Sequence, residues 1–275
     1  MKIEECLAAS SMEFLRSEGA AYRANHPYPH IFFDGFFKPD VAEFLYNNFP
    51  RMEEMPSLFK EPMSYKGQLS DIDNRWPIFS PVFKVLQSKE FIDYISAITG
   101  IEGLLEDSVL AGAGLHQSPK SGFLDIHVDA NFHPLDKTLH RRVNIIIYLN
   151  KGWEAEWGGN LQLWTDGGKK PGLLGAEVEP VFNRAAIFNT TRTSWHGVSP
   201  VVCPPLESRK SIALYYYTKT RPVDEQYEDS SVIWMSKTSK IKMLLYPVFN
   251  FVISILKPYA KYIRRNVFDA SKGSK

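Results

Sequence analysis

The spacing of hydrophobic residues differs between the first and second parts of the chain. In the first part, apolar residues recur at helical spacing over residues 39–49 and again over residues 82–100, where Gly100 is typical of a helix C-terminus. Aromatic and β-branched residues favour a strand over residues 30–37. Residues 51–80 are rich in proline, methionine and charge and show weak periodicity, so we expect a long irregular connection there, and a candidate lid.

In the second part, from residue 126 to residue 217, the pattern becomes that of short strands bounded by Gly, Asn, Pro and Asp. The predicted strands cover residues 143–150, 158–164, 175–181, 184–190, 195–201 and 210–218. Several short strands at regular spacing are typical of a sandwich or a jelly roll. We therefore expect a mainly β protein with flanking helices. The expected regions are an N-terminal helix and strand support over residues 1–110, a β core over 111–222 and a helical tail over 223–275.

The composition is that of a globular protein. With 275 residues, 44% of them hydrophobic, the chain can bury a substantial core. The net charge of +1, and the absence of a basic run interleaved with aromatic residues, argue against a nucleic-acid partner. The N-terminal segment carries acidic residues and lacks the long apolar stretch of a secretory signal. Cys6 and Cys203 are far apart and have no disulfide or metal spacing, so we expect a reducing, cytoplasmic location.

The C-terminal tail differs in charge from the rest of the chain. Residues 233–275 carry a net charge of +8, and the remaining residues carry −7. The apolar run 243–256 contains Pro247 and Asn250 and is shorter than the roughly twenty residues of a transmembrane helix. One interpretation is a helical hairpin that packs on the core or forms a homodimer contact. The other is peripheral attachment to an anionic membrane through the basic residues that flank this run.

One short stretch, HVDANFHP, carries candidate metal chemistry. On an extended segment His127 and Asp129 project to the same side, so an imidazole and a carboxylate can reach one ion. A third ligand must come from elsewhere, and His196 lies in another predicted strand, 67 positions after Asp129. Two histidines and one carboxylate on one face of a metal leave other positions open, which suits a non-haem Fe(II) oxygenase. The competing interpretation is that these are three unrelated polar residues.

A basic residue follows the second histidine. An oxygenase that uses 2-oxoglutarate needs a cation inside its barrel to hold the distal carboxylate, and a guanidinium does so with two parallel hydrogen bonds. Arg209 lies 13 residues after His196, and Lys210 is adjacent to it. Because strand side chains alternate, only one of these two points inward.

The ordered motifs HVDANFHP, VNIIIYLNKGWEAEWGGNLQLWTDG, VEPVFNRAAIFNT, WHGVSPV and SRKSIALYYYT resemble the Fe(II)/2-oxoglutarate dioxygenases of the prolyl 4-hydroxylase type. That family includes the animal oxygen-sensing prolyl hydroxylases and bacterial relatives, and the resemblance covers roughly residues 116–218. It implies a double-stranded β-helix, a jelly-roll barrel, with iron held by His127, Asp129 and His196.

The resemblance also assigns the co-substrate residues. It places Arg209, rather than Lys210, at the C5 carboxylate of 2-oxoglutarate, with the hydroxyl of Tyr148 assisting it. His116 stands where the oxygen-sensing enzymes have another tyrosine in contact with the co-substrate, and it is a departure from the pattern.

The expected function is hydroxylation of an unactivated C–H bond with Fe(II), 2-oxoglutarate and O₂, with ascorbate as a candidate reductant. A peptidyl, prolyl-like substrate ranks first on resemblance, and a free amino acid, lipid or sugar unit is the alternative. Asp129 argues against a halogenase, where a small residue replaces the carboxylate. Two other classes compete: a zinc hydrolase, which has no need of Arg209, and a non-catalytic sugar-binding jelly roll, which would turn over no 2-oxoglutarate.

Overall fold

The computed structural model describes residues 1–225 and 231–235, and a twelve-stranded antiparallel sheet dominates this part of the chain. The strands are β1 (His30–Asp34), β2 (Ser57–Glu61), β3 (Ser64–Leu69), β4 (Gly114–Pro119), β5 (Phe123–Val128), β6 (His140–Tyr148), β7 (Leu161–Asp166), β8 (Pro171–Val178), β9 (Arg184–Asn189), β10 (Trp195–Val198), β11 (Ser208–Thr218) and β12 (Ile233–Trp234). All six strands predicted in the second part of the sequence are present, with ends shifted by a few residues.

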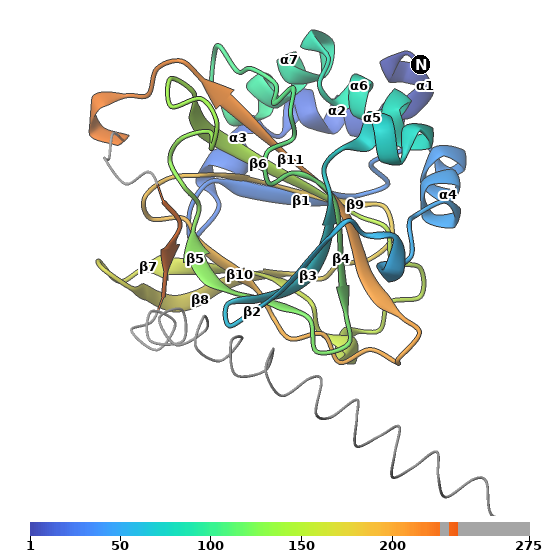
Figure 1. The fold of residues 1–275 in the computed structure, drawn as a ribbon. Coiled ribbons are helices and arrows are strands. Elements are labelled where there is room, and N and C mark those ends of the chain that lie inside the picture. The colour runs from blue at the N-terminus through green and yellow to red at the C-terminus, as the bar shows by residue number, and fades with distance from the viewer. Residues whose placement is uncertain (226–230, 236–275) are drawn as a thin grey trace, which may run out of the picture. The chain divides into compact units, whose positions relative to one another are not determined.

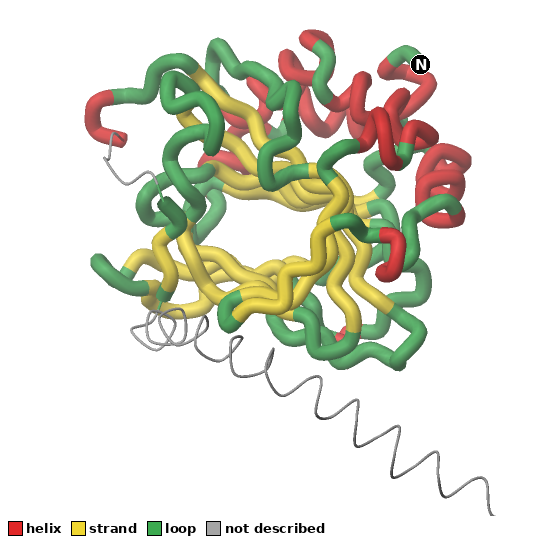
Figure 2. Tube along the Cα trace, in the orientation of Figure 1, coloured by secondary structure: helices red, strands yellow, loops and turns green. Residues whose placement is uncertain are grey.

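The sheet curves into a nearly closed barrel. Its strand order is β1-β9-β6-β11-β4-β3-β5-β10-β7-β8, with β2 paired to β3 and β12 paired to β5. Figure 1 shows β1, β9, β6 and β11 on one side of the barrel and β5, β10, β7 and β8 on the opposite side. The yellow strands in Figure 2 trace the same two layers. The predicted jelly-roll core is confirmed.

Strand β6 shows how the two faces of the barrel wall differ. Ile145 and Ile147 point outward into a core shared with the helices, whereas Ile146 and Tyr148 pack with a smaller cluster inside the barrel. Both faces of the strand are therefore covered at these positions, which explains why residues 145–148 are apolar without interruption rather than alternating. The alternation of side chains then decides which polar residues face inward.

Seven short helices pack outside the barrel wall: α1 (Ile3–Cys6), α2 (Ala9–Ser17), α3 (Gly19–Ala24), α4 (Pro39–Asn47), α5 (Ile72–Arg75), α6 (Ser80–Leu86) and α7 (Lys89–Thr99), counted over the described residues. They lie beside the β1-β9-β6-β11 layer (Figure 1). The single helical pattern predicted over residues 82–100 is two helices, because Ser88 caps α7 by accepting a hydrogen bond from the Phe91 N–H. Gly100 ends α7 in the left-handed conformation, as predicted.

The prediction of an irregular connection over residues 51–80 is wrong. This segment contains the β2–β3 hairpin and α5, and β3 joins the barrel. Its N-terminal residues Ser64 and Tyr65 pair with β5, and residues 67–69 pair with β4. The strands that pair with β3 in the barrel lie more than forty residues away in the sequence. The local pattern of hydrophobic residues is therefore a weak predictor of this strand.

The described helices include none that is long and apolar enough to cross a membrane. The apolar run 243–256 and the basic residues on both sides of it lie outside the described residues. Of the segment predicted as a helical tail, residues 223–225 and 231–235 are described. Val223–Glu225 form one 3-10 turn, and Ile233–Trp234 form strand β12, which pairs with β5, instead of a helix.

The close approach of β3 and β4 generates a stability prediction. Gly114 has φ +107°, and a Cβ there would overlap the carbonyl oxygen of Leu69. Gly114→Ala should lower the free energy of unfolding by about 2 kcal/mol or more, since both backbone strain and a steric clash result. Gly35→Ala is the matched control, because Gly35 also has positive φ but a Cβ added there would meet nothing within 4 Å. Urea unfolding measures both, and equal losses would contradict the role assigned to the clash.

Candidate functional site

The three predicted ligands meet at one end of the β5–β10 pair. His127 is the second-to-last residue of β5, Asp129 follows the strand, and His196 on β10 is the direct cross-strand partner of His127. One candidate ligand atom from each residue lies within 4.8 Å of the other two. All three side chains are buried. The predicted triad is therefore assembled in one place.

Backbone carbonyls orient both imidazoles. The Nδ1–H of His127 donates to the carbonyl of Asp125 at 2.8 Å, and the Nδ1–H of His196 donates to that of Ser194 at 2.8 Å. Nε2 of each ring is thereby left as the lone-pair donor that faces Asp129. Burial, followed by the neighbouring His127, lowers the pKa of His196 to about 4, so this ring is neutral near neutral pH.

Asp129 is held as a carboxylate by a buried cation. The Nη1 of Arg141 lies 3.2 Å from its Oδ1. Burial alone would raise the pKa of Asp129, but Arg141 and the two histidines hold it well below its usual range. The Oδ2 atom is buried and accepts no hydrogen bond within the described residues. An oriented but unpaired oxygen beside two imidazole nitrogens fits a divalent metal of the Fe(II) type, with the remaining coordination positions open.

Arg209 lines the same pocket as the triad. It is 4% exposed, and its Nε–H donates to the carbonyl of Gly159 at 2.7 Å. Its Nη2 has no hydrogen-bond partner within the described residues, and no carboxylate forms an ion pair with it there. Lys210 lies on the outer face, with Nζ 5.6 Å from the ring centroid of Tyr46. Arg209 is therefore the inward residue of the two, and it offers a buried binding site to an anion.

Tyr148 and His116 lie close to Arg209. The Tyr148 ring centroid is 4.9 Å from the guanidinium carbon of Arg209, and burial raises the pKa of this tyrosine. His116 is the cross-strand partner of Ser211 and lines the pocket, with Nε2 lacking a hydrogen bond within the described residues. Burial, then Lys66 and Arg209, hold the pKa of His116 well below its usual range. His116 can therefore offer a neutral imidazole, but not a charge, to a ligand.

Sequence reasoning missed two cations of this site. Lys66 on β3 lines the pocket, but its segment was expected to be irregular. Arg141 is the second residue of β6, and the pairing of β6 with β11 shifts register between Tyr216 and Tyr217. Simple alternation therefore does not predict its inward direction. The adjacent RR pair before VNIIIYLN is the only sequence signal that could have drawn attention to Arg141.

The sequence also favours a loop or surface position for His133, the second histidine of HVDANFHP; the residue lies on the loop after β5, but not at the surface. Its side chain is buried, with Nε2 3.2 Å from Oδ1 of Asp107. Its Nδ1 accepts hydrogen bonds from the backbone N–H groups of Leu135 and Asp136. These contacts use both ring nitrogens, so His133 stabilises the loop after β5 and does not bind the metal.

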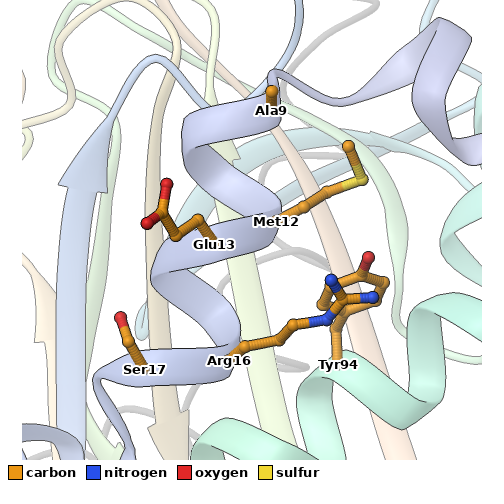
Figure 3. Close-up of a pocket in the computed structure, with 6 residues that line it drawn as sticks. All are labelled: Ala9, Met12, Glu13, Arg16, Ser17 and Tyr94. Carbon is orange, nitrogen blue, oxygen red and sulfur yellow. The ribbon is translucent and has the colours of Figure 1, made fainter.

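A second hollow lies on the outside of the molecule between α2 and α7. Figure 3 shows Arg16 lying over the ring of Tyr94, with the guanidinium carbon 4.5 Å from the ring centroid. Its other lining residues are Ala9, Met12, Glu13 and Ser17. No histidine or cysteine lines it, and this hollow supplies no metal or nucleophile chemistry.

The sequence profile of the 2OG-Fe(II) oxygenase superfamily matches residues 113–217, which contain the whole triad and Arg209. This match covers the barrel core, so that part of the chain is similar to the superfamily. Prolyl 3-hydroxylase OGFOD1 of Mus musculus is 26% identical over an alignment 233 residues long, which covers 78% of this chain and 40% of that protein. The chain thus spans less than half the length of this relative.

Solved structures share the oxygenase fold. A prolyl-4-hydroxylase from Pseudomonas putida aligns with a TM-score of 0.51 and 19% identity, over 74% of this chain and 99% of its own. A prolyl hydroxylase from Trichoplax adhaerens, solved with a peptide of the hypoxia inducible factor oxygen degradation domain, aligns with a TM-score of 0.53 and 15% identity. That alignment covers 76% of this chain and 91% of the other. At these identities the likeness concerns the fold of the oxygenase core.

The three-residue ligand set predicts that the loss of one ligand side chain abolishes metal binding. His196→Ala should reduce iron content from stoichiometric to near zero, because two remaining donors hold Fe(II) weakly. This variant is preferable to Asp129→Ala, which would leave Arg141 buried without its partner. Iron is measured after anaerobic loading and desalting, with circular dichroism to check the fold. The exposed His26→Ala is the control, and full iron content in His196→Ala would show that the ligand is wrongly assigned.

The low pKa of His116 in the folded protein predicts that stability depends on pH. An unfolded chain protonates histidine as the pH falls through about 6.5, whereas folded His116 resists protonation. The unfolded state then binds more protons, so the metal-free protein loses stability as the pH falls below this value. His116→Gln should make that loss shallower in urea unfolding series from about pH 7 to about pH 5. Identical slopes for the variant and the original chain would contradict this.

Proposed function

We propose that this chain is an Fe(II)- and 2-oxoglutarate-dependent hydroxylase that acts on a prolyl or prolyl-like residue of a peptide. The observation that carries the proposal is the union of the His127, Asp129 and His196 triad with the anion site of Arg209 in one pocket. A zinc hydrolase could use the triad but has no need of a buried arginine without an acidic partner. A sugar-binding jelly roll needs neither.

His127, Asp129 and His196 would hold the iron, and Arg209 with Tyr148 would hold the distal carboxylate of 2-oxoglutarate. When bound, Fe(II) activates O₂ and, with 2-oxoglutarate as reductant, supplies the oxidising power for hydroxylation of a C–H bond. In the overall reaction one oxygen atom of O₂ enters the new hydroxyl group and the other enters succinate, with release of CO₂. The iron and the co-substrate are thus both required.

The chain contributes orientation and a dry environment. Backbone carbonyls fix both imidazoles, and Arg141 keeps Asp129 ionised, so the donor set exists before the metal arrives. Ile146, Leu161 and Val198 line the pocket beside these polar groups. Their apolar side chains exclude water from the space between the triad and Arg209, which strengthens the pairing of Arg209 with a carboxylate.

A peptidyl prolyl substrate is supported by the relatives. OGFOD1 is named a prolyl 3-hydroxylase, and the Trichoplax adhaerens enzyme was solved with a peptide bound. A direct test is anaerobic loading with Fe(II) and 2-oxoglutarate, which should produce the visible absorption band of the chelate. Oxygen and proline-containing peptides are then added, and succinate and peptide hydroxylation are measured. No chelate band would refute the oxygenase proposal, whereas a band without peptide hydroxylation would refute only the peptidyl substrate.

Arg209 and Lys210 form a matched pair for testing the co-substrate site. Arg209→Ala should keep iron but raise the 2-oxoglutarate concentration for half-maximal binding by on the order of 10- to 100-fold, since charge-assisted hydrogen bonds are lost. Lys210→Ala should change this value little, because Lys210 lies on the outer face. Titration of the anaerobic chelate band measures both. The opposite ranking would mean that β11 has been assigned the wrong inward face.

A further inference from the structure

Lys66 occupies a distinctive place in the barrel wall. The residues before it on β3 pair with β5, and the residues after it pair with β4. Lys66 itself lies at the junction, where its only strand partner within the described residues is Phe59 of β2. From this position its side chain lines the pocket that contains the metal triad and Arg209. It thus brings a third element, the β2–β3 hairpin, to the site.

Lys66 has no anionic partner in the described residues. It forms no ion pair there, and the nearest acidic influence, Asp129, is already paired with Arg141 at 3.2 Å. Burial lowers the pKa of Lys66 to about 8, with Asp129 opposing the shift, so most molecules carry the charge near neutral pH. The Lys66 Nζ lies 5.8 Å from the ring centroid of Phe59, which is a weaker partner than a carboxylate. A partly buried ammonium group without an acidic partner costs free energy, and such residues are concentrated at functional sites.

The charges of the pocket leave room for an additional anion. The two positive charges of Fe(II) balance the two carboxylates of 2-oxoglutarate. The side chains at the site then comprise one anion, Asp129, and three cations, Arg141, Arg209 and Lys66. The excess positive charge favours a ligand that brings a further carboxylate.

The charged residues of the pocket differ in how far they are exposed to solvent. Arg209 and Asp129 are buried, whereas Lys66 is partly exposed. Arg209 already has Tyr148 beside it and a free Nη2 for the co-substrate. Of these three residues, Lys66 is therefore the most accessible to a ligand that arrives from solvent.

On the basis of the proposed function, we propose that Lys66 binds a carboxylate of the peptide substrate, an aspartate or glutamate side chain near the hydroxylated residue. The enzyme would then select acidic peptides. The ammonium group on a flexible stem forms a charge-assisted hydrogen bond while the target C–H bond lies at the metal. The contact fixes which residue of the peptide reaches the triad.

The test uses binding without turnover. Immobilised full-length protein, loaded anaerobically with Fe(II) and 2-oxoglutarate, selects from a peptide library with a central proline and randomised neighbours, and bound peptides are sequenced by mass spectrometry. We expect aspartate or glutamate enriched on the order of tenfold at a fixed position relative to proline. Lys66→Met should lose the enrichment, and Lys66→Arg should keep it. Lys60→Met is the matched control, because Lys60 is an exposed residue of the same hairpin and its loss should leave the enrichment intact.

The chelate band separates the failure of this inference from failure of the proposed function. Lys66→Met should form the band at the same 2-oxoglutarate concentration as the original chain. A large loss of co-substrate affinity in this variant would assign Lys66 to 2-oxoglutarate and overturn the inference. A normal band with no acidic enrichment, or with enrichment that survives Lys66→Met, would also overturn it. Absence of the band in the original chain would instead overturn the proposed function.

Discussion

The antiparallel register between β5 and β10 is the constraint on which the rest of the site depends. It places His127 directly opposite His196, and Asp129 follows at the end of β5. A slip of one residue would turn one imidazole to the other face of the sheet and leave the metal with two donors at most. The backbone carbonyls that hold both Nδ1 atoms belong to these same strand segments, so register and ring orientation are set together.

The buried charged residues around the triad determine its protonation states and the ligands that the pocket favours. Arg141 is buried and lies over the ring of Tyr215, with its guanidinium carbon 3.9 Å from the centroid, while it pairs with Asp129. The triad thus keeps an ionised Asp129 carboxylate and a neutral His196 imidazole in a buried environment. Arg209 has no comparable acidic partner within the described residues, so its desolvation is offset only when an anion binds. The pocket is consequently built for anionic ligands.

The β2–β3 hairpin links the support region to this chemistry. By pairing with both β4 and β5, β3 bridges the gap between the two layers of the barrel and carries Lys66 into the pocket. Residues from the first part of the chain therefore contribute to the site as well as to the outer core. A segment with weak sequence periodicity thus contributes a charged residue to the pocket.

The sequence by itself determined the strands of the second part, the C-terminal cap of α7 and the shared direction of His127 and Asp129, because alternation and capping are local properties. Resemblance assigned His196 as the third ligand, and the pairing of β5 with β10 brings it to the other two residues. The sequence left open whether Arg209 or Lys210 points inward, and resemblance alone favoured Arg209. Tertiary structure decided what depends on distant partners: β3 and its Lys66, and the burial of His133 against Asp107. The tertiary structure also decided that the Arg141 side chain points inward, because the register shift between β6 and β11 interrupts the alternation of side chains there. Such contacts join residues far apart in the chain, and no local pattern encodes them.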